Sequence, residues 1–196
     1  MKILSVKTHD RRFPLGPGAG SDAIHRDPVY SYAVTELHLE DGTVATGLAF
    51  TLGEGNDLVC RAAEFLAREL PGRKIEELMS DFGAWQRAAS NEQQFRWLGP
   101  HKGVVHLALA SVTNACWDAW ALCRKVPLWQ LLLDLDTDAL LRTLDFSYVE
   151  DCVGPQTARE LIDTARASRG ERQSIIDNGY PGYDTSIGWI HYSDEE

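Results

Sequence analysis

Apolar and polar residues alternate along the first fifty positions with the two-residue period of β-strands. Three runs show this period, over residues 3–13, 30–39 and 43–50, and Asp41 followed by Gly42 is a turn dipeptide favoured in tight hairpins. The pattern predicts a small antiparallel sheet of three strands. Because so small a sheet is not stable with both faces in water, we expect other elements to cover one face.

Two segments beside the predicted strands are rich in glycine. Residues 15–28 read LGPGAGSDAIHRDP, and residues 51–56 read TLGEGN. Glycine and proline at this density do not continue a strand or a helix. Both segments are therefore predicted to be loops, and the longer one a mobile loop.

A helical period replaces the strand period after the second loop. Apolar residues recur every three or four positions over 58–70 and over 75–89, and Ser80 with Asp81 is expected to break the second run and cap a new helix. Over 104–122, apolar or small residues occupy nearly every helical face. This distribution predicts a buried central helix.

Four side chains of the central helix can be interpreted from their spacing. Trp117 and Trp120 lie on one side and can anchor partner helices, because residues three apart share a helical face. Asn114 and Asp118 form a polar pair that needs hydrogen-bond partners if it is buried. We interpret this pair as a structural contact rather than a catalytic one, because no base or ligand at suitable spacing accompanies it.

The rest of the chain is predicted to contain shorter elements. A short helix covers 127–133, a β-like run covers 144–149, and a polar surface helix covers 155–176. Residues 180–192 are predicted as a strand with a loop, and 193–196 match a helix capping box with no apolar run behind it. Such an ending is expected where a longer α/β domain is cut after its first unit; a disordered acidic tail is the alternative.

Composition and charge limit the classes of partner that the chain can bind. It has 196 residues, 44% of them hydrophobic, with a formal net charge of −10 and a pI near 5.0. We expect no nucleic acid and no membrane as partner, because the main electrostatic term would be repulsive. The cysteines lack C-x-x-C spacing and are expected to be buried thiols. No secretory signal is recognisable at the N-terminus, so we expect a cytoplasmic location.

Several stretches together resemble one known family. They read GSDAIHRDPVYS (20–31), FTLGEGND (50–57), FRWLGPHKGVVHLALASVTNACWDAW (95–120), LDFSY (144–148) and YPGYDTSIGWIHYSDE (180–195). They are similar to the enolase superfamily of the mandelate racemase/muconate lactonizing enzyme type, and within it to the L-fuconate dehydratase family. The resemblance implies an α+β fold, with an enolase-like N-terminal capping domain over 1–141. Over 142–196 it implies a linker, a surface helix and the first strand of a truncated TIM-type (β/α) barrel.

The resemblance also implies a reaction, the magnesium-assisted dehydration of an acid sugar by a hydro-lyase. A base removes the proton α to the carboxylate, Mg²⁺ stabilises the enediolate, and loss of the 3-hydroxyl gives a 2-keto-3-deoxy sugar acid. In the family, the metal ligands and the bases lie on later barrel strands. We therefore expect no catalytic residue and no metal ligand in this chain, which would be inactive without the missing barrel domain.

The candidate substrate-binding residues are implied by the same resemblance. They are Gly20, Ser21, Asp22 and Tyr30, which fall on positions that contact the substrate in the family. Glycine lets backbone N–H groups approach sugar hydroxyls, while the carboxylate of Asp22 and the phenol of Tyr30 can bond them directly. From the residues alone, ordinary turn-forming roles are the alternative.

Other polar residues near the loops have two interpretations each. His25 and Arg26 can help to attract an anionic sugar acid, or they can be a solvated loop surface. An interface between cap and barrel is the expected role of a group before the central helix, namely Arg96, Trp97, His101 and Lys102.

Two other functions remain open at this stage. One is a stand-alone, non-catalytic capping or interaction module, and the other is a racemase or cycloisomerase of the same superfamily, which shares the enediolate intermediate. A homo-oligomer is also open. If a barrel normally covers part of the surface, exposed apolar residues there predict poor solubility or self-association of the chain alone.

Overall fold

The computed structural model describes residues 1–98, 103–179 and 182. Its first unit is a three-stranded antiparallel sheet in the order β1-β2-β3, which confirms the strand prediction. The hairpin between the last two strands places Gly42 at a positive φ of 88°, a conformation that glycine adopts without strain. The strands are β1 (Ile3–Pro14), β2 (Val29–Leu39) and β3 (Val44–Thr51).

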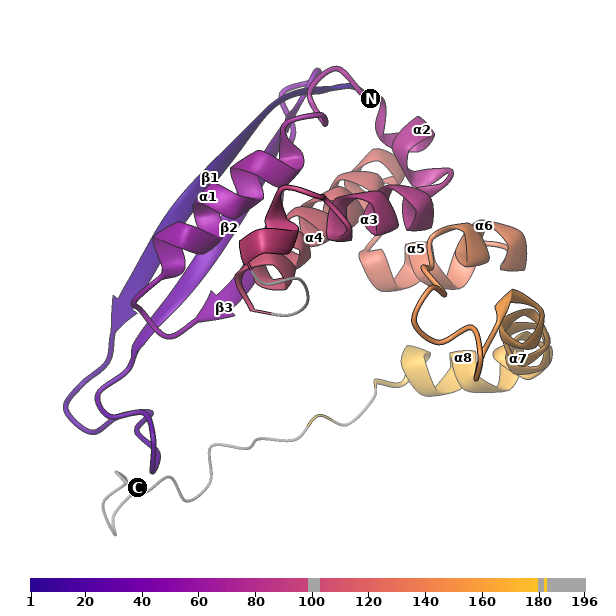
Figure 1. The fold of residues 1–196 in the computed structure, drawn as a ribbon. Coiled ribbons are helices and arrows are strands. Elements are labelled where there is room, and N and C mark those ends of the chain that lie inside the picture. Colours follow the sequence, from indigo (N-terminus) through magenta and orange to yellow (C-terminus); the bar gives the residue numbers. More distant parts are fainter. Residues whose placement is uncertain (99–102, 180–181, 183–196) are drawn as a thin grey trace, which may run out of the picture.

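Helices cover one face of this sheet (Figure 1). Along β2 the residues that face the helices are buried, and the intervening residues are partly exposed. The covering helices are α1 (Asn56–Ala67) and α4 (Val104–Arg124), which confirms the predicted helical cover and the predicted central helix. The buried residues of β2 are Ser31, Ala33, Thr35, Leu37 and Leu39.

The backbone of α4 lies unusually close to the backbone of β3. A Cβ atom placed on Gly47 would lie 2.2 Å from both the Ala115 nitrogen and the Ser111 oxygen. Ser111 also occupies this interface, where its Oγ lies 2.8 Å from Thr35 Oγ1 and donates to the Ala33 carbonyl at 2.9 Å. The close approach therefore requires glycine at this position of β3. The buried hydroxyls of Ser111 and Thr35 must also bond each other or a backbone carbonyl, because water cannot reach them.

The polar pair on α4 bonds the outer edge of the sheet. The Thr46 N–H donates to Asp118 Oδ2 at 2.8 Å, and Asn114 Nδ2 donates to the Leu48 carbonyl at 3.1 Å. An exposed strand edge is a site for unwanted pairing with another strand, and these side chains occupy two of its groups. The structural interpretation of Asn114 and Asp118 is confirmed.

Two short helices pack against the C-terminal half of α4. They are α2 (Ile75–Met79) and α3 (Phe82–Ser90), separated by the break that was predicted. Trp117 meets the Phe82 ring at 5.7 Å edge to face, and Trp120 Nε1 donates to Glu76 Oε2 at 3.0 Å, so both tryptophans anchor partner helices. Asp81 occupies the N-cap position of α3 but makes no side-chain capping bond.

The remaining elements correct two predictions. Residues 144–149 form no strand: 144–146 are irregular and 147–149 lie in a turn, because Asp145 accepts the Ser147 N–H at 3.1 Å and folds the backbone locally. The predicted helix over 155–176 is divided at Ser168, and a helix capped by Asp136 was missed. The elements are η1 (Phe95–Leu98), α5 (Leu128–Asp134), α6 (Thr137–Arg142), α7 (Pro155–Ala167) and α8 (Arg169–Asp177).

The cysteine prediction holds for two of the four residues. Cys60 and Cys116 are buried, whereas Cys123 is half-buried and Cys152 is exposed; all four are free thiols. Burial raises the pKa of the Cys116 thiol to about 12, so that thiol is unreactive at neutral pH.

Several predictions concern residues that lie outside the described part of the chain. They include the strand over 180–192, apart from Gly182, the capping box over 193–196, and the roles of His101 and Lys102. The side chain of Arg96 is likewise outside it. Within the described ranges, no helix combines the length and the apolar character that crossing a bilayer would need.

Candidate functional site

The first glycine-rich loop is a compact structure held by its own hydrogen bonds. The Asp27 N–H donates to Ser21 Oγ at 3.0 Å, and the Gly18 N–H donates to Asp27 Oδ1 at 3.0 Å. These bonds join the two sides of the loop between β1 and β2. The Ser21 side chain therefore holds the loop closed in this structure. Its contact with a substrate stays a prediction.

Asp22 is the most heavily bonded residue of the loop. Its Oδ1 accepts the N–H groups of Ile24 at 2.8 Å and His25 at 2.6 Å, and its Oδ2 lies 3.0 Å from His25 Nδ1. The backbone bond from His25, followed by its ring and the Ile24 N–H, lowers the pKa of Asp22 to about 2. The carboxylate is therefore ionised at neutral pH, and much of its accepting capacity serves the loop itself.

The structure brings Gly20 and Tyr30 together. Gly20 has a positive φ of 69°, and a Cβ atom added to it would lie 3.2 Å from the Tyr30 hydroxyl oxygen and 2.8 Å from Leu15 Cδ1. A side chain at position 20 would therefore displace the tyrosine or strain the backbone. Two residues that the resemblance selected separately, ten positions apart, belong to one contact.

Tyr30 is held from the other side by an aromatic cluster at the end of the sheet. Its ring meets Phe50 edge to face with the centroids 5.1 Å apart, and Phe50 in turn lies 5.5 Å from Tyr32. Edge-to-face aromatic pairs add to the stability that comes from burying their surface. The cluster fixes the direction in which the Tyr30 side chain leaves β2.

The second glycine-bearing loop lies beside the base of the first. Gly53 has a φ of 100°, and a Cβ atom placed there would lie 3.3 Å from Val29 Cβ, at the start of β2. Both predicted loops therefore meet at the same end of the sheet. The later loop is followed directly by Asn56, the first residue of α1.

Asn56 is a residue of this region that sequence reasoning missed. It is fully buried, accepts from Thr51 Oγ1 at 2.7 Å, and donates to Asp10 Oδ1 at 2.6 Å. Arg12 bonds the same aspartate, which lowers the pKa of Asp10. The asparagine follows a glycine at a helix start, which suggests a cap, but its partners on β1 and β3 were not readable from that signal.

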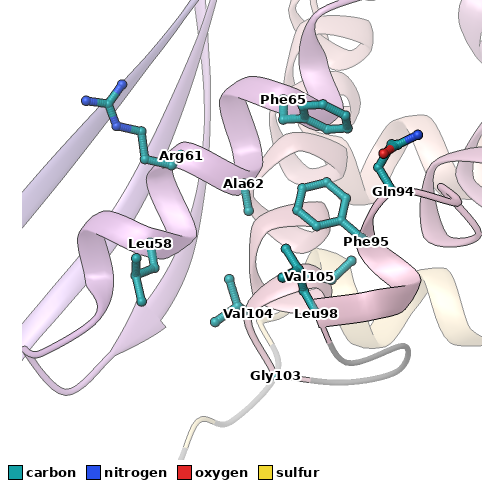
Figure 2. Close-up of a pocket in the computed structure, with 10 residues that line it drawn as sticks. All are labelled: Leu58, Arg61, Ala62, Phe65, Gln94, Phe95, Leu98, Gly103, Val104 and Val105. Atoms are coloured by element: carbon teal, nitrogen blue, oxygen red, sulfur yellow. The ribbon is translucent and has the colours of Figure 1, made fainter.

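An apolar pocket lies between α1, η1 and the start of α4. It has a volume of about 680 Å³, and Figure 2 shows Leu58, Phe65, Phe95 and Val104 directed toward it while Arg61 points away. Close by, Trp97 is 94% exposed. Among the described residues that line it, Arg61 and Gln94 are the polar ones and no carboxylate, imidazole or thiol is present, so this part of the lining does not resemble a catalytic site.

Carboxylate, imidazole and thiolate groups are the side chains that bind metal ions in proteins. Across residues 1–98 and 103–179, no group of three or more His, Cys, Asp or Glu side chains is arranged to hold a metal ion. The residues in these ranges thus do not fit a magnesium site, and we derive no reaction step through a metal in this part of the protein.

Comparison with solved structures identifies the class of the protein. Human mitochondrial enolase superfamily member 1 superposes with a TM-score of 0.91 at 39% identity, over 99% of this chain and 45% of that chain. A magnesium-bound racemase from Streptomyces coelicolor shares the fold with a TM-score of 0.57 at 23% identity, over 69% of this chain and 36% of that chain. The chain belongs to the enolase superfamily, and its sheet with covering helices is the N-terminal capping domain of that fold.

Curated relatives narrow the comparison to particular proteins. Mitochondrial enolase superfamily member 1 of Bos taurus is 41% identical over 98% of this chain and 44% of its own length. L-galactonate dehydratase of Hypocrea jecorina is 36% identical over 99% of this chain and 44% of its own length. The chain thus spans less than half the length of these relatives. No protein-family model matches it.

Proposed function

We propose that this chain is part of a magnesium-dependent acid-sugar dehydratase, a hydro-lyase acting on L-galactonate, L-fuconate or a related sugar acid. The observation that carries the proposal is the 36% identity to L-galactonate dehydratase over 99% of the chain. The matched region covers nearly the whole chain and therefore spans both glycine-bearing loops, the segments that would meet a substrate.

In this proposal the capping domain contributes recognition and not chemistry. Gly20, Ser21, Asp22 and Tyr30 would line the part of the pocket that faces the sugar chain. The contact between Gly20 and Tyr30 supports this assignment, because it presents a backbone segment and a phenol hydroxyl at one place. When the loops close, they would exclude water from the reacting end of the substrate.

Magnesium and the catalytic bases would be supplied by the barrel, outside the described residues. A divalent ion stabilises the negative charge that develops on a carboxylate when its α-proton leaves. The proposed division is a cap over 1–141 and, over 142–196, a linker, a surface helix and the first strand of the barrel. The cytoplasm is the proposed location, and the acid sugar and the barrel are the proposed partners.

A direct assay tests this proposal. The complete coding sequence is expressed, and the product is incubated with Mg²⁺ and either L-galactonate or L-fuconate. We expect formation of a 2-keto-3-deoxy acid, measured with a reagent for 2-keto acids, and its loss with EDTA. Epimerised substrate without 2-keto acid would instead indicate a racemase, and no turnover of any acid sugar would favour a non-catalytic module.

A matched pair of variants tests the loop assignment. Gly20→Ala places a methyl group 3.2 Å from the Tyr30 hydroxyl, so KM is expected to rise about tenfold or more. Gly16→Ala is the control in the same loop, because nothing lies within 4 Å of its added Cβ. An equal effect of the two changes would show that loop flexibility, and not this contact, sets KM.

A further inference from the structure

Asp22 and His25 form a carboxylate–imidazole pair in the loop between β1 and β2. The His25 Nδ1 atom lies 3.0 Å from one carboxylate oxygen of Asp22 and 3.1 Å from the other. The same carboxylate accepts the backbone N–H of His25, so the ring and its own backbone are held by one group. The ring orientation is therefore fixed locally, without help from the rest of the protein.

The pair also determines which ring nitrogen carries the proton. Asp22 is ionised at neutral pH, since its pKa is about 2, and an ionised carboxylate only accepts hydrogen bonds. The proton of the neutral imidazole must then reside on Nδ1. In this neutral form, Nε2 is a hydrogen-bond acceptor that points away from the carboxylate, in the manner of a histidine oriented by a carboxylate partner.

The position of His25 makes this acceptor available to a ligand. The bond from the Asp27 N–H to Ser21 Oγ closes the neck of the loop, and residues 22–26 beyond it are exposed. The His25 side chain is 49% exposed. An exposed histidine with random orientation would contribute little to recognition, whereas a fixed one has already lost the freedom that binding would remove.

We propose that His25 Nε2 accepts a hydrogen bond from the terminal hydroxyl of a sugar-acid substrate, and that Asp22 is the positioning residue that holds it for this contact. The inference rests on the proposed function, in which the reacting carbons 1 to 3 face the barrel and the loop meets the other end. His25 is then a specificity-determining residue, and Asp22, besides lining the pocket as proposed above, holds the His25 ring in position.

The two candidate substrates differ at the terminal carbon, whose hydroxyl would bond His25. L-fuconate is the 6-deoxy form of L-galactonate, so it carries a methyl group where L-galactonate carries the terminal hydroxyl. A site built to bond a hydroxyl rejects the analogue that lacks it, because the acceptor is left without a partner. His25 would therefore favour L-galactonate over L-fuconate.

The test compares both substrates in the complete enzyme with Mg²⁺. His25→Phe keeps a ring of similar size but removes Nε2, and we expect it to lower kcat/KM for L-galactonate about tenfold or more while L-fuconate changes less than about twofold. The loss should appear in KM. His25→Gln, which retains a polar group near the Nε2 position, should recover part of the preference.

A spectroscopic measurement tests the role of Asp22 separately. In the complete protein labelled with ¹⁵N-histidine, the His25 nitrogen shifts should report the Nδ1–H form, and Asp22→Asn should shift the ring toward a mixture of tautomers. The preference for L-galactonate should fall in the same variant. A merely structural aspartate would leave the tautomer unchanged, and that result would overturn its positioning role.

A neighbouring residue supplies the control. Arg26→Ala removes an exposed charge from the same loop and should leave the ratio of kcat/KM for the two substrates unchanged. Equal losses for both substrates in His25→Phe, or a larger change of the ratio in Arg26→Ala, would overturn the inference while the proposed function stands. If the unmodified enzyme dehydrates neither acid, the proposed function itself fails.

Discussion

The contact of β3 with α4 and the attachment of α7 and α8 are built in opposite ways. Where β3 meets α4, two backbones touch across Gly47, and a buried hydroxyl pair joins α4 to the neighbouring strand β2. Where α7 and α8 are attached, arginine side chains bond the C-terminal end of α5, and Ala158 is the sole buried residue of α7. Tight packing leaves no room for adjustment, whereas long charged side chains can reposition.

The arginine contacts of α7 and α8 show this second principle. Arg169 donates to the Leu133 carbonyl at 2.8 Å and to Asp134 Oδ1 at 2.9 Å, and Arg166 donates to the Leu135 carbonyl. These carbonyls belong to the last turn of α5 and the residue after it, where helical partners run out and cations interact favourably. The attachment should therefore depend on salt, and the contact between β3 and α4 should not.

The largest expected effect comes from Gly47→Ala. The added methyl group would lie 2.2 Å from two backbone atoms of α4, which cannot move without shifting the helix. We expect a loss of about 3 kcal/mol or more in the free energy of unfolding, measured by urea denaturation. Gly16→Ala, where the methyl group meets nothing within 4 Å, should stay within about 0.5 kcal/mol of the parent.

The next effect concerns the hydroxyl pair between β2 and α4. Ser111→Ala leaves Thr35 Oγ1 without its partner at 2.8 Å and should cost about 1–3 kcal/mol. Thr35→Val removes the other hydroxyl of the pair. The double variant should cost less than the sum of the single changes, because no hydroxyl of the pair is then left unpaired. Strict additivity in urea denaturation would contradict the coupling.

A smaller and more local effect is expected from Arg169→Ala. It removes the bonds to Leu133 and Asp134, so amide hydrogen exchange should accelerate in α7 and α8 while the strands keep their protection. High salt should produce the same pattern in the parent chain. Arg61→Ala, at a side chain that is 82% exposed, is the control, and general loss of protection would contradict a local attachment.

The smallest effect is expected from lowering the pH, which weakens an ion pair between α6 and α7. Asp138 accepts from Arg159, and that bond lowers the pKa of Asp138 below its ordinary value of 3.8. A carboxyl group with a lowered pKa stabilises the folded state above its unfolded-state value and loses that contribution as the pH falls through its folded value. Between pH 5 and pH 2, the protection of the α7 amides relative to their intrinsic exchange rates should therefore fall in the parent and change less in Asp138→Asn.

Much of the candidate site was predictable from residues that carry local meaning. The glycines predicted both loops, and the resemblance selected Gly20, Ser21, Asp22 and Tyr30, whose contact with a substrate stays a prediction. The sequence could not show which of these residues contact one another. The contact of Gly20 with Tyr30, and the bonds of Asn56 to Asp10 and Thr51, join residues from different strands. No local pattern encodes such distances.

By itself, the sequence determined the three strands and most of the helices, because strand and helix periods are local properties of the chain. It also determined the family, through stretches spread over most of its length. It failed at 144–149, where a side-chain bond of Asp145 to Ser147 outweighs strand propensity.

Tertiary structure alone decided which polar residues work together. Asn114 and Asp118 became edge bonds because α4 lies against β3 at a distance that only glycine permits. Asp22 became a partner of His25 because the loop closes on itself through Ser21 and Asp27. Hydrogen bonds depend on distances of a few tenths of an ångström, and those are fixed only when the whole chain is packed.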